Sequence, residues 1–276
     1  MRHVNALVGG LIDAALSPFE SLPPIVGLSA VSLAVAVAML LAMRLTTNQR
    51  AIAAVKRRIE AAFFEVRLFN DDVRALHALG DVLRHNLSYF RLSLAPLPWV
   101  AVPLVLLIAH LQFYYGYDGF APTQSTVLKV RLKESAVLVS GAAPSIEVVA
   151  PPGITIQTPH VWIPGEREAA WRIGFDHPGE YELTVTAGAS IVSKRIRVSD
   201  QLGWRTPGRY AAGWLNEVLY PAEPPIDGEA PIESIIVHYG ERKVSIFGMS
   251  TGWLVVFFVL TLLFAWILRS RFGVVI

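Results

Sequence analysis

Apolar residues follow three different patterns along the chain, and each pattern predicts a different kind of element. The first pattern consists of three long runs with almost no charged residues, at 25–43, 97–115 and 247–268. Each run is roughly 19 to 22 residues long, which is enough to cross about 30 Å of hydrocarbon as an α-helix. We therefore assign transmembrane helices to 22–44, 96–116 and 247–268.

The second pattern is an alternation of apolar and polar residues between about 126 and 198. It contains about seven short strands separated by Pro, Gly, Asp and Ser, which predicts an immunoglobulin-like β-sandwich over 120–200. Trp171 is expected in its core. Residues 176–181 resemble the turn and tyrosine corner before the penultimate strand of such folds, with Tyr181 as the corner residue.

The third pattern is a heptad repeat between 47 and 94, whose apolar positions are separated alternately by three and four residues. The spans on either side of it leave and re-enter the membrane on the same face. A continuous helix of about 48 residues would travel ~70 Å away from the bilayer, so the stretch must turn. The turn signal is at Asn70, Asp71 and Asp72, which predicts an antiparallel coiled-coil hairpin over 45–95.

The remaining segments are shorter and less regular. Residues 1–21 form a weakly amphipathic segment. Within 201–246, the amphipathic stretch at 209–219 lies either at the membrane interface or under the sandwich. Residues 232–247 alternate as a β-hairpin whose turn falls at Gly240, Glu241 and Arg242, and 269–276 form a short tail.

Composition agrees with a membrane protein and excludes several classes of site. The 276 residues are 53% hydrophobic and 17% charged, whereas soluble domains are about a quarter charged. Cysteine is absent, which excludes disulfides, thiolate catalysis and cysteine metal sites. The net charge of +2 is too small to indicate nucleic acid, so no DNA partner is expected.

Cationic residues predict the orientation in the membrane. They concentrate in the heptad loop, which contains Arg44, Arg50, Lys56, Arg57, Arg58, Arg67, Arg74, Arg84 and Arg91. By the positive-inside rule, this loop and the C-terminus are cytoplasmic, and the N-terminus and 116–246 are outside. The predicted fold is an α-helical protein of a bacterial inner membrane. It has three transmembrane helices, a cytoplasmic antiparallel helical hairpin and an extracytoplasmic immunoglobulin-like β-sandwich.

The sequence contains no recognisable catalytic arrangement. There is no serine nucleophile elbow, phosphate loop or dinucleotide fingerprint, and His160, His177 and His238 have no metal-site spacing. We therefore expect a protein that is not an enzyme and that needs no metal or cofactor.

Four groups of residues are candidates for contacts. The Lys56, Arg57 and Arg58 cluster is either a positive-inside signal that touches anionic lipid or a contact with ribosomal RNA. Near the hairpin tip, three phenylalanines either pack around the tip or contact a partner: Phe63, Phe64 and Phe69. In the second span, His110 and Gln112 are candidates for interhelical hydrogen bonds. Arg44 is either a groove residue or an arginine that snorkels at the end of its span.

The order of an outer N-terminus, one span, a basic cytoplasmic hairpin and two further spans resembles the YidC-type superfamily of membrane-protein insertases. The resemblance rests on residues 43–50, on 56–60 and on the proline-bearing second span with Pro96, Pro98 and Pro103. It is closest to the three-span branch, which comprises the unknown-function family 106, the third subunit of the ER membrane complex and the calcium-load-linked coiled-coil protein.

The resemblance implies an insertase-like function, in which a polar groove eases membrane-protein clients across the bilayer. Its groove residues would be Arg44, Asn48 and Gln49, and the hairpin would contact clients or the ribosome. The long outer segment has no counterpart in small members of the superfamily. The alternative is therefore a non-catalytic scaffold or complex subunit whose outer sandwich binds an envelope protein.

Overall fold

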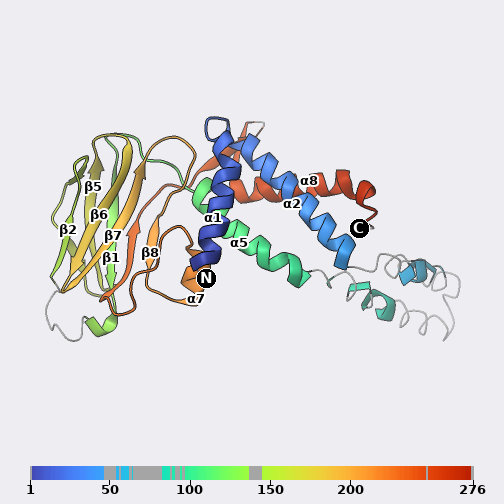
Figure 1. The fold of residues 1–276 in the computed structure, drawn as a ribbon, viewed down its shortest axis with the longest axis horizontal. Helices are drawn as coiled ribbons and strands as arrows, with labels where there is room; N and C mark the ends of the chain where they lie inside the picture. The colour runs from blue at the N-terminus through green and yellow to red at the C-terminus, as the bar shows by residue number, and fades with distance from the viewer. Residues whose placement is uncertain are drawn as a thin grey trace. The chain divides into compact units, whose positions relative to one another are not determined.

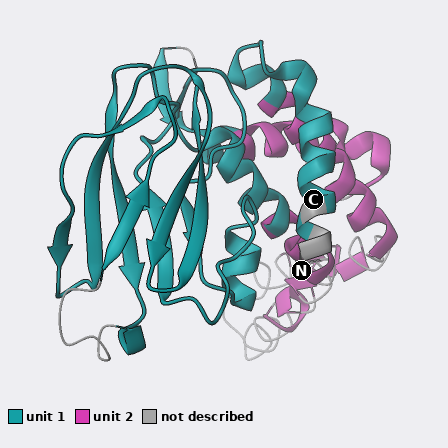
Figure 2. Ribbon diagram, turned by 60° about the vertical axis from the view of Figure 1, so that its left-hand side comes forward, with its two compact units in different colours: residues 1–27, 106–256 teal, residues 28–105, 257–276 magenta. Residues whose placement is uncertain are grey.

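The computed structural model describes residues 2–46, 97–136, 145–246 and 248–274, together with helical pieces at 54–55, 57–61, 64, 83–87, 89–90 and 94. The chain divides into two compact units (Figure 2). One unit comprises Met1–Gly27 and Leu106–Val256, and the other comprises Leu28–Val105 and Phe257–Ile276. The first unit contains the β strands, and each of the three long helices is divided between the two units.

Three helices are long and apolar enough to cross a membrane, as the sequence predicts: α2 (Pro24–Thr46), α5 (Leu97–Tyr115) and α8 (Trp253–Phe272) (Figure 1). α2 begins at Pro24, whose ring fixes a helical φ where no amide hydrogen bond is needed. Within the second unit, Ser32 Oγ on α2 donates a hydrogen bond to the Phe257 carbonyl on α8 at 3.4 Å. This buried bond joins two apolar helices through a small polar side chain.

The N-terminal segment forms α1 (Arg2–Leu16) and a short 3-10 helix, η1 (Ser17–Phe19). Ile12 and Leu16 on α1 are buried, whereas Leu7 and Leu11 are largely exposed. The segment is therefore helical with one covered face, in agreement with its amphipathic sequence.

All strands of the β domain pair antiparallel, in two sheets. The larger sheet has the order β3-β5-β1-β9-β8, with β4 also paired to β5. Its strands are β1 (Ser125–Leu132), β3 (Ile154–Ile156), β4 (Val161–Ile163), β5 (Glu168–Phe175), β8 (Gly208–Tyr210) and β9 (Ile232–Val237). The smaller sheet has the order β2-β6-β7, formed by β2 (Ile146–Val149), β6 (Gly179–Ala187) and β7 (Ser190–Val198).

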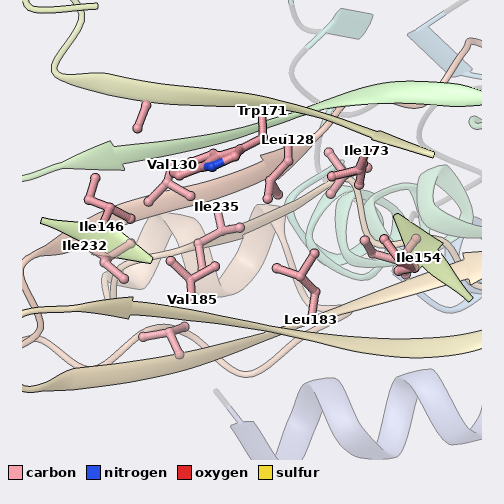
Figure 3. Packing of buried hydrophobic residues seen from close by; sticks show 14 of the residues in the cluster. Leu128, Val130, Ile146, Ile154, Trp171, Ile173, Leu183, Val185, Ile232 and Ile235 are labelled. Carbon is pink, nitrogen blue, oxygen red and sulfur yellow. The ribbon is translucent and has the colours of Figure 1, made fainter. Parts of the chain in front are cut away.

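Alternating side chains of both sheets form one hydrophobic core (Figure 3). On β1, Leu128 and Val130 are buried while Lys129 between them is exposed, which is the alternation expected when one face of a strand meets a core. Leu183 and Val185 on β6 enter the same core from the smaller sheet. The period-two pattern of the sequence therefore matches the inward faces of β1 and β6.

Two predicted landmarks of the β domain are present. Trp171 on β5 is buried in the core. Tyr181 Oη donates a hydrogen bond to the His177 carbonyl at 2.8 Å, which is the bond that defines a tyrosine corner. Gly153 lies against the Tyr181 ring with φ of +100°, and a Cβ at this position would approach the ring to 2.6 Å. A glycine is therefore required for both the backbone conformation and the close approach.

The predicted hairpin over 232–247 is wrong. β9 pairs with β1 and β8 inside the larger sheet, and β10 (Lys243–Ile246) instead forms a hairpin with β11 (Met249–Gly252). Ile232, Ile235 and Val237 are all buried, and a strand with so many buried residues is stabilised as an interior strand. Two consequences follow: the β domain extends beyond residue 200, and α8 begins at Trp253 rather than at 247.

The heptad stretch is described only in pieces. Residues 57–61 and 83–87 are helical, whereas the expected turn at Asn70, Asp71 and Asp72 lies outside the described residues. Four expected seam residues are exposed: Leu83, Leu87, Phe90 and Leu94. The antiparallel pairing of the two arms stays a prediction.

Candidate functional site

Only some of the predicted groove and hairpin residues lie in the part of the chain that the structure describes. Arg44 lies exposed in the last turn of α2. Arg57, Arg58 and Phe64 lie exposed in short helical pieces. The other candidates lie outside the described residues: Asn48, Gln49, Lys56, Phe63 and Phe69.

His110 and Gln112 lie instead where α5 meets the β domain. His110 is buried, with Nδ1 at 2.7 Å from the Leu106 carbonyl and Nε2 at 3.4 Å from the Asn5 carbonyl on α1. Gln112 Oε1 accepts a hydrogen bond from Trp253 Nε1 at 2.8 Å. Gln112 thus makes an interhelical hydrogen bond between the end of α5 and the start of α8.

Aromatic side chains surround this end of α5. Phe113, Tyr114 and Tyr115 are all buried. Trp204 packs edge-to-face against Tyr114 with ring centroids 6.2 Å apart, and its Nε1 donates to Asp13 Oδ1 on α1 at 3.1 Å. Side chains from α1, α5 and the segment after β7 therefore interlock. We call this cluster the α5 junction; it comprises Asn5, Asp13, His110, Gln112, Phe113, Tyr114, Tyr115, Trp204, Arg205 and Trp253.

Arg205 is the charged centre of the α5 junction. Its backbone N–H donates to the Phe113 carbonyl at 2.8 Å. Its guanidinium donates to three carbonyls, those of Ser199 at 2.8 Å, Gln201 at 2.6 Å and Gly203 at 3.2 Å. Burial is the main cause that lowers the pKa of Arg205 to about 10, which still leaves it protonated at neutral pH. Arg205 thus fixes the loop after β7 to the end of α5.

A second buried cation, Lys194, lies on the core face of β7. Its side chain is fully buried, and its Nζ lies 3.0 Å from Glu223 Oε1. Nζ also donates to Thr206 Oγ1 at 2.9 Å, to the Arg195 carbonyl at 3.1 Å and to the Thr206 carbonyl. Glu223 Oε1 accepts a further bond from the Arg195 N–H at 3.0 Å. This pair joins β7 to the segment after α7 (Trp214–Leu219).

Neither buried cation is predicted from the sequence, although the position of Lys194 within its strand indicates that its side chain is buried. In β7, Val192, Lys194 and Ile196 share one phase of the alternation, so a lysine occupies an inward position. Such a position requires a buried partner. Arg205 left no comparable signal, because it lies in a segment without periodicity.

Burial lowers the pKa of Lys194 to about 8, against the opposing effect of Glu223. The unfolded chain therefore binds this proton more tightly than the folded chain, so stability should rise as the pH passes from 8 toward the ordinary lysine pKa of 10.5. We expect the free energy of unfolding to rise by about 2 kcal/mol between pH 7.5 and pH 10, relative to a Lys194→Met, Glu223→Met double variant. Denaturant unfolding of the full chain in detergent, followed by tryptophan fluorescence, measures this difference. A fall over the same pH range would mean that attraction to Glu223 outweighs burial.

No family model, curated protein or solved structure matches this chain. Within the part of the chain that the structure describes, no group of three or more His, Asp or Glu side chains is arranged to hold a metal ion.

Proposed function

We propose that this protein is a non-catalytic membrane scaffold or complex subunit whose outer β domain binds an envelope protein. The observation that carries the proposal is the apolar edge of the larger sheet, formed by β3 and β4. Ile156, Val161 and Ile163 are 39%, 62% and 37% exposed there. Outward positions of edge strands are usually charged or otherwise protected from pairing, so exposed β-branched residues favour a partner at this edge.

The α5 junction supports the same function, because it fixes the β domain to the end of α5. The contacts of Arg205, Trp204 and Gln112 all lie within the first compact unit. A binding surface that is held rigidly loses little conformational entropy when a partner docks. A flexibly tethered β domain would lose more conformational entropy when a partner binds.

The proposal includes the placement in the membrane and the class of the β domain. Basic residues occupy the last turns of α2 and α8: Arg44, Arg269 and Arg271. These favour a cytoplasmic C-terminus, with the N-terminus and β domain outside a bacterial inner membrane. One core between two antiparallel sheets and the Tyr181 corner favour an immunoglobulin-like sandwich.

Charged substitutions at the β3–β4 edge test the proposed docking surface. We expect Val161→Glu with Ile163→Glu to lower partner recovery at least about tenfold, because two desolvated carboxylates would oppose an apolar partner. The partner is first captured with a photo-crosslinking residue at 161 in intact membranes, and recovery is then quantified by mass spectrometry. Ile191→Glu is the matched control, because Ile191 is 73% exposed on the smaller sheet. Equal losses from both sheets, or no crosslink at 161, would contradict the proposal.

The insertase-like function is the competing proposal, and Arg44 distinguishes the two. Arg44 is exposed at the basic end of α2, where the resemblance requires a groove cation. Under the scaffold proposal, Arg44→Ala leaves partner recovery and client insertion unchanged. Under the insertase proposal, the same substitution slows the insertion of short-tailed membrane clients while the charged edge variant has no effect on insertion.

A further inference from the structure

The outer face of α1 is apolar and exposed. Leu7 and Leu11 lie four positions apart, on one face of the helix, and are 64% and 62% exposed. On another face of the same helix, Ile12 and Leu16 are buried. Residues 6–12 contain no polar side chain. A helix at the surface of a soluble domain normally presents polar residues outward, so this face favours an apolar environment.

α1 packs against the last turns of α5. The Asn5 carbonyl lies 3.4 Å from His110 Nε2, and a Cβ at Gly9, one turn further along α1, would lie 3.9 Å from the His110 ring. His110 is five residues before Tyr115, the end of α5, which corresponds to about 7 to 8 Å along the helix axis. Helices that lie in a membrane interface bury their apolar face by about 5 to 10 Å. If α5 crosses a membrane, α1 therefore meets it at the depth of the interface.

The exposed leucines lie on the side of α1 that faces away from the β domain. Asp13 Oδ1 accepts a hydrogen bond from Trp204 Nε1, which lies in the segment after β7, at 3.1 Å. Successive residues of an α-helix are rotated by about 100° around its axis, so Leu11 points roughly 200° away from Asp13. Leu7, one turn before Leu11, lies on the same side. The segment after β7 thus contacts the polar side of α1 and leaves its apolar side exposed.

The chain continues from α1 into a helix that is long enough to span a membrane. Only η1 and residues 20–23 separate Leu16 from Pro24, the first residue of α2. The sequence has no Lys or Arg between Arg2 and Arg44, so residues 3–43 offer no cation to anionic headgroups. The acyl chains around the start of α2 offer the apolar contact that the exposed face of α1 lacks.

We propose that α1 lies in the interface of the membrane that α2 and α5 cross, with Leu7 and Leu11 inserted among the acyl chains of neutral lipids. Asp13 and its bond to Trp204 then lie on the water-facing side of the helix. With 15 residues, α1 is too short to span a bilayer, which takes about 20. This interfacial position requires that α2 and α5 cross a membrane, as proposed above, and it adds a second kind of lipid contact.

Nitroxide labels on single cysteines test the interfacial position, since the chain has no cysteine of its own. Labels at Leu7→Cys and Leu11→Cys, in the full chain in phosphatidylcholine nanodiscs, are compared for collisions with oxygen and with a water-soluble nickel chelate. Oxygen concentrates among the acyl chains. We expect the ratio of oxygen to nickel collisions to be at least about fivefold higher than at Ile191→Cys, an exposed control on β7.

Two results at position 11 would overturn the proposal. A ratio equal to that at Ile191→Cys would mean that the exposed face of α1 lies in water. Low collision rates with both reagents would mean that protein, rather than lipid, covers the face.

Val105→Cys distinguishes the position of α1 from the membrane placement on which it depends. Val105 is 50% exposed near the middle of α5, so its label should report acyl chains whether or not α1 touches lipid. A lipid signal at 105 with a water signal at 11 would overturn the position of α1 alone. Water signals at both would overturn the membrane placement of α5, and the position of α1 with it. Docking at the β3–β4 edge is tested separately, by the crosslink at 161.

Lipid composition tests the apolar character of the contact. Because residues 3–43 contain no Lys or Arg, the collision ratio at 11 should change by less than about twofold when phosphatidylglycerol replaces about a third of the phosphatidylcholine. A lipid signal that appears only with phosphatidylglycerol would overturn the assignment to neutral lipids.

Discussion

Lys194→Met should lower the free energy of unfolding of the β domain by about 3 to 5 kcal/mol at pH 7, because it leaves the buried Glu223 carboxylate without the hydrogen-bond donor that Lys194 Nζ supplies. Glu223 is almost fully buried and loses its bond to Lys194 Nζ in this variant, while Thr206 Oγ1 loses a donor. The smaller sheet would also lose its tie to the segment after α7. Chemical unfolding in detergent, followed by tryptophan fluorescence, measures the change.

The double variant Lys194→Met, Glu223→Met is the control for this prediction. It removes both charges and replaces them with flexible apolar side chains, so its stability should return to within about 1 kcal/mol of the wild type. If the double variant were as unstable as the single one, the loss would come from packing rather than from an unpaired charge. The pair would then have no electrostatic role.

Arg205→Met should be the second severe substitution, with a loss of about 3 kcal/mol or more, since three carbonyl oxygens lose a charged donor. The loop at 199–203 would lose the guanidinium that holds its carbonyls, although the Arg205 N–H bond to Phe113 would stay. We therefore expect faster proteolytic cleavage within 199–207 before global unfolding. Limited proteolysis and denaturant unfolding of the full chain measure the two effects.

Two further variants serve as comparisons for Arg205→Met. Arg205→Lys keeps the charge but has a single donor group, so its loss should be intermediate. Arg172→Met removes an exposed cation from β5 and should change stability by less than about 0.5 kcal/mol. If Arg205→Met were no worse than Arg172→Met, the carbonyl network would be dispensable and the β domain would be fixed by other contacts.

Local patterns predict much of this fold, because they reflect local physics. Length and polarity identify the three long helices, and alternation identifies the inward residues of β1 and β6. The tyrosine corner at Tyr181 is predictable from the sequence because its hydrogen bond joins two residues only four positions apart, Tyr181 and His177.

The features that sequence reasoning missed depend on distant segments. β9 alternates like a hairpin strand, but it pairs with β1, about a hundred residues earlier in the chain. The partner of Lys194 is Glu223, in an irregular segment, so the inward lysine could be noticed but its partner could not be named. The carbonyls that surround Arg205 depend on the conformation of a loop without a sequence signature.

The hydrogen bond between Gln112 and Trp253 joins the end of α5 to the start of α8. The β domain follows α5 and precedes α8, and the end of α5 and the start of α8 are hydrogen-bonded to each other. It is therefore an insertion whose two ends lie close together. Such an insertion can be gained, lost or exchanged without moving the helices on either side. The β domain therefore has the connectivity of a module inserted between α5 and α8.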